Sequence, residues 1–203
     1  MIFCSKHHNL FDKPVPSYIF DPYRTTMNVA ESIKASLREV RDYPKPGIVF
    51  KDITPLLANP ELMRAAVQLL ADRYRAAKPD AIAACEARGF IFGSILAMEL
   101  AVPFVPVRKA GKLPYKTLKQ DYALEYGHAT LEMHIDAVQP GWNVLVHDDV
   151  LATGGTAAAT AKLIHFAGGH VAGFSFIINL SFLLGEEKLK HEFGIEPYSL
   201  VTF

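Results

Sequence analysis

The chain contains 203 residues, enough for one domain with a substantial core and too few for two well-packed ones. Its 21 basic and 21 acidic residues give a formal net charge of +0, so there is no broad basic field to attract nucleic acid. Any anion must therefore be bound by local charge.

Cysteine usage and apolar tracts narrow the class of protein further. Cys4 and Cys85 are the only cysteines, which argues against a disulfide framework or a cysteine-based zinc site and fits a reducing cytoplasm. The longest apolar tract, residues 171–184, is too short to span a bilayer, so no membrane partner is expected. Residues 1–26 lack the apolar core of a signal peptide. We expect them to form a poorly ordered extension or a strand-like arm, with Met27 as a candidate start for a domain over residues 27–203.

The first half of the chain alternates predicted helices and strands. In residues 30–40, Ile33, Leu37 and Val40 recur at the spacing of an amphipathic helix, which the prolines at 44 and 46 end. A buried strand of small residues is expected just before the charged turn at 86–90. That strand is residues 81–85. The other elements expected in this half are a short strand at 47–51, a helix at 61–77 and a helix at 91–100.

Polar segments follow two of the predicted strands. The charged turn at 86–90 lies where α/β folds place binding residues, although a surface Glu–Arg pair is the ordinary alternative. After a strand at 102–107, residues 108–126 are basic, polar and without clear periodicity, which predicts a long loop or an extended hairpin. Such a segment is often simply solvated. Beside an anion site, it would serve as a lid that excludes water.

Residues 131–137 predict a strand with one buried face. Leu131, Met133 and Ile135 alternate with Glu132 and His134, so the two polar residues are expected on a solvent-exposed face. Further along the chain, the expected elements are a strand at 170–179, a short helix at 185–191 and a closing strand at 198–202.

The most informative stretch is residues 144–164. An apolar run leads to Asp148 and Asp149, then to a loop of small residues and an alanine-rich helix. Gly154 and Gly155 allow backbone N–H groups to converge on an anion, and the positive end of the helix dipole favours a phosphate there. Neighbouring strand residues point to opposite faces, so both aspartates serve one ligand only if the strand has ended at Asp148. The plainer alternative is an acidic strand end followed by a glycine turn.

Residues 144–156 resemble the phosphoribosyl pyrophosphate (PRPP) signature of the type I phosphoribosyltransferases. Four other segments occur in the order used by one branch of that family, the adenine phosphoribosyltransferases: residues 44–57, 86–93, 107–114 and 124–127. The resemblance covers the chain from about residue 29 to its end. It implies a single α/β domain with a mostly parallel central sheet flanked by helices, a small hood from the N- and C-terminal segments and an antiparallel, flexible lid.

The resemblance also implies roles for individual residues. Glu125 is the candidate for proton handling at the base, and Asp148 and Asp149 would stabilise charge that develops on the ribose. Lys51 and Asn179 depart from residues common in relatives, Arg and Glu respectively. The remaining expected contacts are Ala152, Thr153, Gly154, Gly155 and Thr156 with Asp148 and Asp149 for the PRPP phosphate and ribose; Arg88, Arg108, Lys109 and Lys112 for pyrophosphate; and Val49, Phe50 and Leu180 for the base.

The implied reaction transfers the 5-phosphoribosyl group from PRPP to adenine, giving AMP and pyrophosphate. Mg²⁺ is the expected cofactor, and it would be bound mainly through PRPP oxygens, since no metal motif is present. In the family, the residue matching Arg108 reaches the neighbouring subunit's site, which implies a homodimer. Alternatives are transfer to another purine base, such as xanthine or hypoxanthine, and a non-catalytic PRPP-sensing regulator on the same fold. The resemblance and the cysteine usage together predict a cytoplasmic enzyme.

Overall fold

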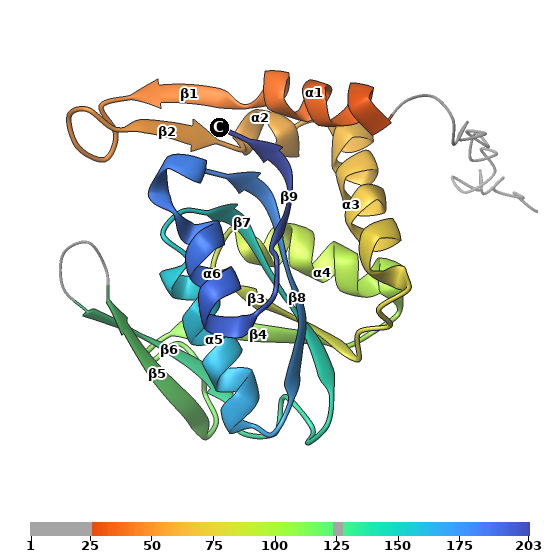
Figure 1. The fold of residues 1–203 in the computed structure, drawn as a ribbon, viewed down its shortest axis with the longest axis vertical. Helices are drawn as coiled ribbons and strands as arrows, with labels where there is room; N and C mark the ends of the chain where they lie inside the picture. Colours follow the sequence, from red (N-terminus) through yellow and green to blue (C-terminus); the bar gives the residue numbers. More distant parts are fainter. Residues whose placement is uncertain (1–25, 124–127) are drawn as a thin grey trace, which may run out of the picture.

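The computed structural model describes residues 26–123 and 128–203, which form a seven-stranded sheet with helices on both faces and a separate two-stranded hairpin (Figure 1). The large sheet has the strand order β5-β6-β4-β3-β7-β8-β9. Neighbours from β4 to β9 in this order run parallel, whereas β6 pairs antiparallel with both β4 and β5. The expected α/β fold with a mostly parallel sheet is confirmed. The strands are β3 (Ala81–Cys85), β4 (Phe104–Lys109), β5 (Thr117–Ala123), β6 (His128–His134), β7 (Asn143–Leu151), β8 (His170–Asn179) and β9 (Tyr198–Thr202).

The helices divide the core into two layers. Helices α3 (Pro60–Arg75) and α4 (Gly89–Leu100) cover one face of the sheet, and α5 (Gly155–Phe166) and α6 (Gly185–Phe193) cover the other (Figure 1). Successive residues of β7 pack alternately into these layers: Val144 and Val146 contact the α5 layer, and Leu145 contacts the α3–α4 layer. Burial on both faces explains why the central strands read as continuous apolar runs.

A hood lies over the carboxyl ends of the central strands (Figure 1). It comprises α1 (Thr26–Ser36), β1 (Arg38–Arg41), β2 (Val49–Asp52) and the short helix α2 (Thr54–Leu57). The expected helix over residues 30–40 is therefore wrong in its last part. Residues 38–41 pair antiparallel with β2, with Val40 opposite Phe50, and this ladder overrides the helical spacing of the apolar residues.

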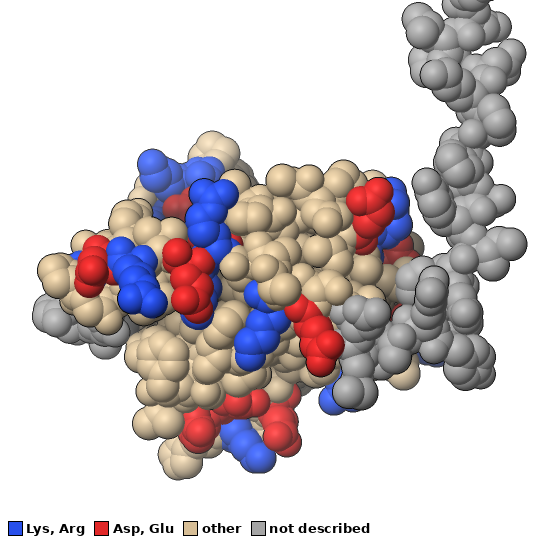
Figure 2. Space-filling view, turned by 90° about the horizontal axis from the view of Figure 1, so that it is seen from above, with Lys and Arg blue, Asp and Glu red and all other residues tan. Residues whose placement is uncertain are grey.

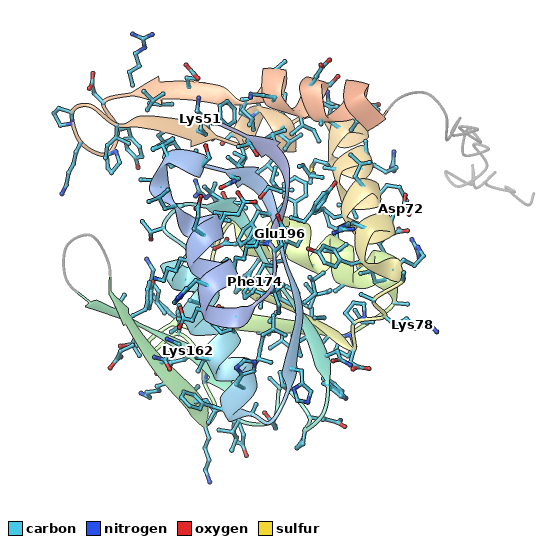
Figure 3. The ribbon with its side chains drawn as sticks, viewed as in Figure 1. Lys51, Asp72, Lys78, Lys162, Phe174 and Glu196 are labelled. Atoms are coloured by element: carbon cyan, nitrogen blue, oxygen red, sulfur yellow. The ribbon has the colours of Figure 1, made fainter. Side chains whose placement is uncertain are left out.

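The hood contacts the end of β9 through Lys51, which Figure 3 shows beside the C-terminal strand. The Lys51 ammonium lies 3.9 Å from the centroid of the Phe203 ring. Lys51 also pairs with Glu39 across the β1–β2 hairpin. The hood is thus connected to the main sheet through the last residue of the sequence.

The segment predicted as a lid, residues 108–126, contains β5, which pairs antiparallel with β6 and so extends the main sheet. The strand expected over residues 131–137 is β6, which starts and ends three residues earlier. The expectation that Glu132 lies on an exposed face is wrong: only 3% of its surface is accessible. Lys119 of β5 and the backbone amide of Gly111 cover its carboxylate. Conversely, Ile135 follows the end of β6 and is exposed, not buried as the alternation predicted.

Two sequence-based expectations fall on residues outside the described part of the chain. These are the N-terminal extension, of which residues 1–25 are not described, and Glu125 in the segment 124–127. Within the described ranges, no helix is long and apolar enough to cross a membrane. The face seen in Figure 2 carries basic and acidic side chains side by side, without a field of one sign.

Candidate active site

The loop between β7 and α5 forms a small hollow at the start of the helix. Gly154 has a φ of +74°, which a residue with a Cβ rarely adopts, and α5 begins at the next residue. The hollow has a volume of about 60 Å³ and opens beside the N–H groups of the first helical turn. It is lined by Asp148, Val150, Leu151, Ala152, Thr153, Gly154, Gly155, Thr156, Ala157 and Phe176.

This loop packs tightly against Gly185, the first residue of α6. A Cβ at Gly185 would lie 2.2 Å from the carbonyl oxygen of Ala152 and 2.9 Å from the amide nitrogen of Gly154. Only glycine therefore allows α6 to approach the loop this closely. Sequence reasoning missed this contact, because one glycine at a helix start carries no signal of its distant partner.

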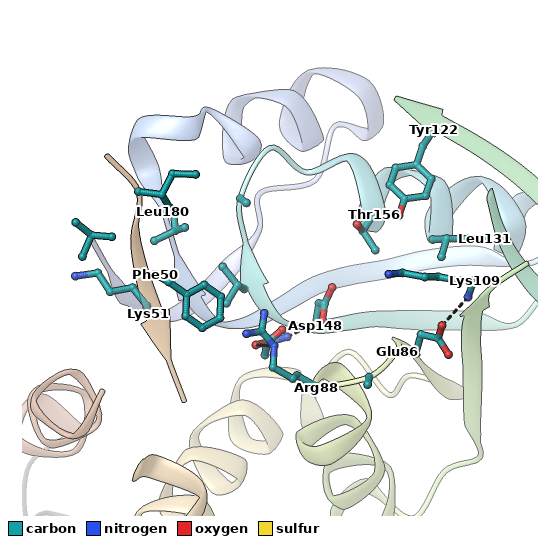
Figure 4. Close-up of a pocket in the computed structure, with 16 residues that line it drawn as sticks. Phe50, Lys51, Glu86, Arg88, Lys109, Tyr122, Leu131, Asp148, Thr156 and Leu180 are labelled. Carbon is teal, nitrogen blue, oxygen red and sulfur yellow. Dashed lines mark hydrogen bonds and ion pairs between the residues drawn. The ribbon is translucent and has the colours of Figure 1, made fainter. Parts of the chain in front are cut away.

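A larger cavity of about 400 Å³ lies next to the hollow, under the hood and at the carboxyl ends of the strands (Figure 4). The hood, the β3–α4 turn, the lid strands and the β7–α5 segment all contribute to it, as expected for an α/β fold. Its lining residues are Ile48, Val49, Phe50, Lys51, Glu86, Ala87, Arg88, Lys109, Tyr122, Leu131, Asp148, Asp149, Val150, Ala152, Thr156 and Leu180.

The two aspartates lie at the centre of this cavity. Strand β7 continues through both of them to Leu151, and yet both line one cavity. The condition that the strand must end at Asp148 for both to face one ligand is therefore wrong. Burial and the neighbouring carboxylate of Asp149 raise the pKa of Asp148 well above its ordinary value. Burial also raises the pKa of Asp149, and the guanidinium of Arg88 opposes this shift. A cationic ligand group would favour the ionised pair.

Close packing around the turn after β3 fixes the position of Asp148. A Cβ at Gly89 would lie 2.7 Å from Asp148 Oδ1, so the start of α4 must be a glycine to lie against this carboxylate. The Glu86–Ala87 peptide just before it is cis. Arg88 extends from this turn, and its Nε lies 2.8 Å from Asp149 Oδ2.

One end of the cavity is apolar and flat, between Phe50 of the hood and Leu180 after β8 (Figure 4). The guanidinium of Arg88 lies 5.1 Å from the centroid of the Phe50 ring, so Arg88 contacts both the aromatic wall and the acid pair. Val49, also on the cavity wall, is 43% exposed in this hood strand. This end suits a planar ring with polar edges.

The opposite end of the cavity carries Lys109, beside Glu86, and is called the basic end after this lysine (Figure 4). The Glu86 carboxylate accepts hydrogen bonds from Arg108 Nε at 2.5 Å and from the Lys109 amide at 3.1 Å. Although burial opposes ionisation, these bonds lower the pKa of Glu86. Arg108 is thus engaged by Glu86 within this chain. Neither Arg108 nor Lys112 is among the residues that line the cavity.

Among the polar side chains that line the cavity, three were not assigned to the site from the sequence. Lys51 was left without a role, Glu86 was treated as part of the turn only, and Tyr122 as part of a polar loop. The Tyr122 phenol has a raised pKa, mainly because of burial, and a hydrogen bond with Thr156 partly opposes the shift. The aromatic residues within the basic segment were the available signal for Tyr122.

The structure therefore brings most of the predicted site residues together. The cavity includes Val49, Phe50, Leu180, Arg88, Lys109, Asp148, Asp149, Ala152 and Thr156, and the hollow includes Thr153, Gly154 and Gly155. In the described part of the chain, no group of three or more His, Cys, Asp or Glu residues could hold a metal ion. Asn179 is buried behind Leu180, where its Nδ2 donates to Glu186 at 2.8 Å.

Comparisons with known proteins agree with this geometry. Residues 52–181 match the family model described as the phosphoribosyl transferase domain. The chain is 56% identical over 159 residues to an adenine phosphoribosyltransferase of Cytophaga hutchinsonii, covering 78% of this chain and 88% of that protein. It is 54% identical over 178 residues to the enzyme of that name from Erwinia tasmaniensis, covering 88% and 97%.

Solved structures give the same result for the fold. An adenine phosphoribosyltransferase from Thermoanaerobacter pseudethanolicus superposes with a TM-score of 0.82 and 49% identity, covering 86% of this chain and 99% of that one. The Saccharomyces cerevisiae protein, solved with adenine and an imino-altritol bisphosphate, gives a TM-score of 0.81 and 36% identity, with coverage of 86% and 99%.

Proposed function

The chain belongs to the phosphoribosyl transferase family, among the adenine phosphoribosyltransferases, and from this membership we propose how its residues carry out the reaction. The enzyme transfers the 5-phosphoribosyl group from PRPP to adenine, giving AMP and pyrophosphate. One observation carries the assignment of roles. The acid pair of β7 lies between an anion hollow at a helix start, a flat apolar wall and a basic end, all on connected cavities.

We assign the hollow to the 5-phosphate of PRPP. Backbone N–H groups at the start of α5 are fixed donors, and Thr153 and Thr156 add hydroxyls beside them. The ribose then lies over Asp148 and Asp149, whose carboxylates accept hydrogen bonds from its hydroxyls. As the bond from C1′ to pyrophosphate loosens, positive charge grows on the ribose, and the ionised acid pair stabilises it.

The base is assigned to the wall between Phe50 and Leu180. Ring stacking supplies affinity there, and the backbone of Val49 reads the edge of the heterocycle. Binding at this end places the base on the side of the ribose opposite Lys109. Glu125, which lies outside the described residues, remains our candidate for sharing the proton of the base as N9 attacks C1′.

Pyrophosphate is assigned to the basic end, with Lys109 directly on the cavity and Arg88 beside the acid pair. Arg88 changes partners in this proposal: its fork leaves Asp149 and takes phosphate oxygens. Arg108 and Lys112 can bind pyrophosphate only if the lid brings them closer to the cavity or if they reach the cavity of a second subunit. Because Arg108 is expected to reach the second subunit, we also propose a homodimer.

The donor set around the acid pair fits Mg²⁺ as the cofactor. The described residues hold no cage of metal ligands, whereas one or two carboxylates next to a phosphate-bearing substrate are what Mg²⁺ ordinarily uses. When bound with PRPP, the ion would neutralise charge on the departing pyrophosphate. Cys85 is a free thiol, which agrees with a reducing compartment, and we propose the cytoplasm.

The Asp149→Asn variant tests the role of the acid pair. This change keeps the shape of the side chain but removes the charge that stabilises the ribose cation, so kcat should fall about tenfold to a hundredfold. Initial rates with adenine, PRPP and Mg²⁺ measure it. Asp136→Asn, at an exposed position far from the cavity, is the matched control. An Asp149→Asn enzyme with the wild-type kcat would remove this carboxylate from the mechanism.

The same assay with hypoxanthine, guanine and xanthine should give little nucleotide, because adenine is the base assigned to the Phe50 wall.

A further inference from the structure

Residues 109–112, which begin at the last residue of β4 and carry Lys109 and Lys112, are held by hydrogen bonds at every position. The Lys109 amide donates to Glu86 at 3.1 Å, and the Ala110 amide donates to the carbonyl of Thr130 at 3.0 Å. The Gly111 amide donates to Glu132 Oε2 at 3.0 Å, and the carbonyl of Lys112 accepts from Arg108 at 3.0 Å. Backbone held at each residue gives the side chain of Lys109 a fixed origin at the edge of the cavity.

Glu132 connects this segment to the lid. In the sheet, Glu132 of β6 pairs with Arg108 of β4 on one side and with Lys119 of β5 on the other. One carboxylate oxygen accepts from the Gly111 amide, and the other lies 2.8 Å from the ammonium of Lys119. Hydrogen bonds from Lys119 and Gly111 lower the pKa of Glu132, so the buried side chain is an anion.

Gly111 makes this contact specific. Its φ is +78°, a left-handed conformation that suits glycine, and its amide donates to Glu132 of β6. Burying a carboxylate is costly unless it is paired and hydrogen-bonded, as Glu132 is here. Here it ties a loop of the pyrophosphate end to the lid strand.

We propose that Glu132 is a positioning residue for PRPP, which holds residues 109–112 so that Lys109 faces the leaving pyrophosphate. Glu132 does not touch the substrate itself, and its effect passes through the Gly111 amide. The inference rests on the proposed role of Lys109. It predicts that loss of the acceptor raises the KM for PRPP and leaves the KM for adenine unchanged.

Three variants separate the two bonds of Glu132. Glu132→Leu removes both, Lys119→Met removes only the ion pair, and Glu132→Gln keeps an oxygen that accepts from Gly111. A hydrogen bond to a charged group is lost in Glu132→Leu, so its KM for PRPP should rise about tenfold. The other two variants should stay close to wild type. Glu192→Leu, which breaks an ion pair between α6 and Lys162 away from the site, is the control.

A Lys109→Met background distinguishes the two claims. If Glu132 acts through Lys109, Glu132→Leu adds little to the KM for PRPP once Lys109 is absent. If Lys109→Met raises this KM and Glu132→Leu does not, the inference is overturned while the role of Lys109 stands. If Lys109→Met has no effect, the proposed role of Lys109 fails and the inference fails with it. Equal effects of Glu132→Gln and Glu132→Leu would also overturn it.

If Glu132→Leu does not fold, Glu132→Asp replaces it, because this change withdraws the carboxylate by one methylene. Glu132→Asp should raise the KM for PRPP in the same way, and an unchanged KM would overturn the inference.

Discussion

His147, the residue directly before the acid pair, is fully buried between the sheet and α4. Its Nδ1 lies 3.2 Å from the hydroxyl of Ser175, and its Nε2 has no hydrogen-bond partner within the described part of the chain. Burial lowers the pKa of His147 from its ordinary value of 6.5 to about 3, and the hydrogen bond with Ser175 opposes this shift. The imidazole is therefore neutral in the folded enzyme at every working pH.

This burial predicts a pH-dependent stability. Below its ordinary pKa of ~6.5, His147 binds a proton when the chain unfolds but not when it is folded, so acid favours the unfolded state. The free energy of unfolding should fall by about 1.4 kcal/mol per pH unit as the pH drops below that value, or about 2 kcal/mol at pH 5. Denaturant titrations between pH 5 and 7 measure this as the difference between wild type and His147→Leu.

The difference between the two proteins is the informative quantity, because Asp148 and Asp149 titrate in both. Their raised pKa values act in the opposite sense: the folded state holds their protons more tightly, so acid stabilises it through them. His170→Gln, at an exposed position, should parallel wild type. Parallel curves for wild type and His147→Leu would show that His147 becomes charged in the folded protein.

At the scale of elements, the anion hollow depends on the approach of α6 to the β7–α5 loop. Gly185→Ala places a methyl group 2.2 Å from the carbonyl oxygen of Ala152, so the loop or the helix must move. We expect a loss of about 1–3 kcal/mol in stability from overpacking, together with a higher KM for PRPP, because the loop carries the phosphate donors. Thermal unfolding and initial rates measure the two effects.

Gly169→Ala provides a matched overpacking control. A Cβ there would lie 2.8 Å from Val138 and 3.0 Å from Ile164, far from the cavity. It should cost similar stability and leave the KM for PRPP at the wild-type value. If Gly185→Ala behaves in the same way, the packing of α6 does not shape the phosphate site.

The elements that sequence reasoning predicted well are those whose burial is set locally. Strands β3, β8 and β9 have the expected bounds, because their apolar runs are flanked by polar or turn residues. Strand β1 was missed because Ile33, Leu37 and Val40 fit a helical spacing, whereas its structure is decided by pairing with β2. Register with a distant partner is not encoded in a local pattern.

The same distinction applies to the site. The acid pair and the glycine loop follow one another within a single strand, loop and helix, so their proximity was predictable from residues 144–164. Glu132 and Tyr122 acquire their surroundings from other segments, namely the Gly111 amide for one and Thr156 for the other. Alternation alone predicted that Glu132 is exposed to solvent. The loop that covers its carboxylate lies 21 residues earlier in the sequence, so the local pattern carries no sign of it.

At the scale of the whole molecule, the base wall is completed by contact between the hood and the last strand. The carbonyl of Phe203 accepts from the amide and hydroxyl of Ser181, at 3.0 and 2.7 Å, and its amide donates to Asn179, so its backbone is fixed on both sides of Leu180. The ammonium groups of Lys34 and Lys51 lie 4.6 and 3.9 Å from the centroid of the Phe203 ring. Lys51 adjoins Phe50 in β2 and also lines the cavity.

Phe203→Ala should therefore loosen the hood and weaken adenine binding. Two cation–π contacts of about 0.5–1 kcal/mol each are lost, so the KM for adenine should rise about fivefold or more while the KM for PRPP stays unchanged. Phe203→Tyr keeps an aromatic ring beside the two ammonium groups and should retain the wild-type KM for adenine. Phe166→Ala, at a phenylalanine that is 64% exposed on α5, is the control. If Phe203→Ala changes the KM for adenine and the KM for PRPP equally, its effect is a general destabilisation. If the KM for adenine is unchanged, the hood holds Phe50 and Val49 in place without this contact.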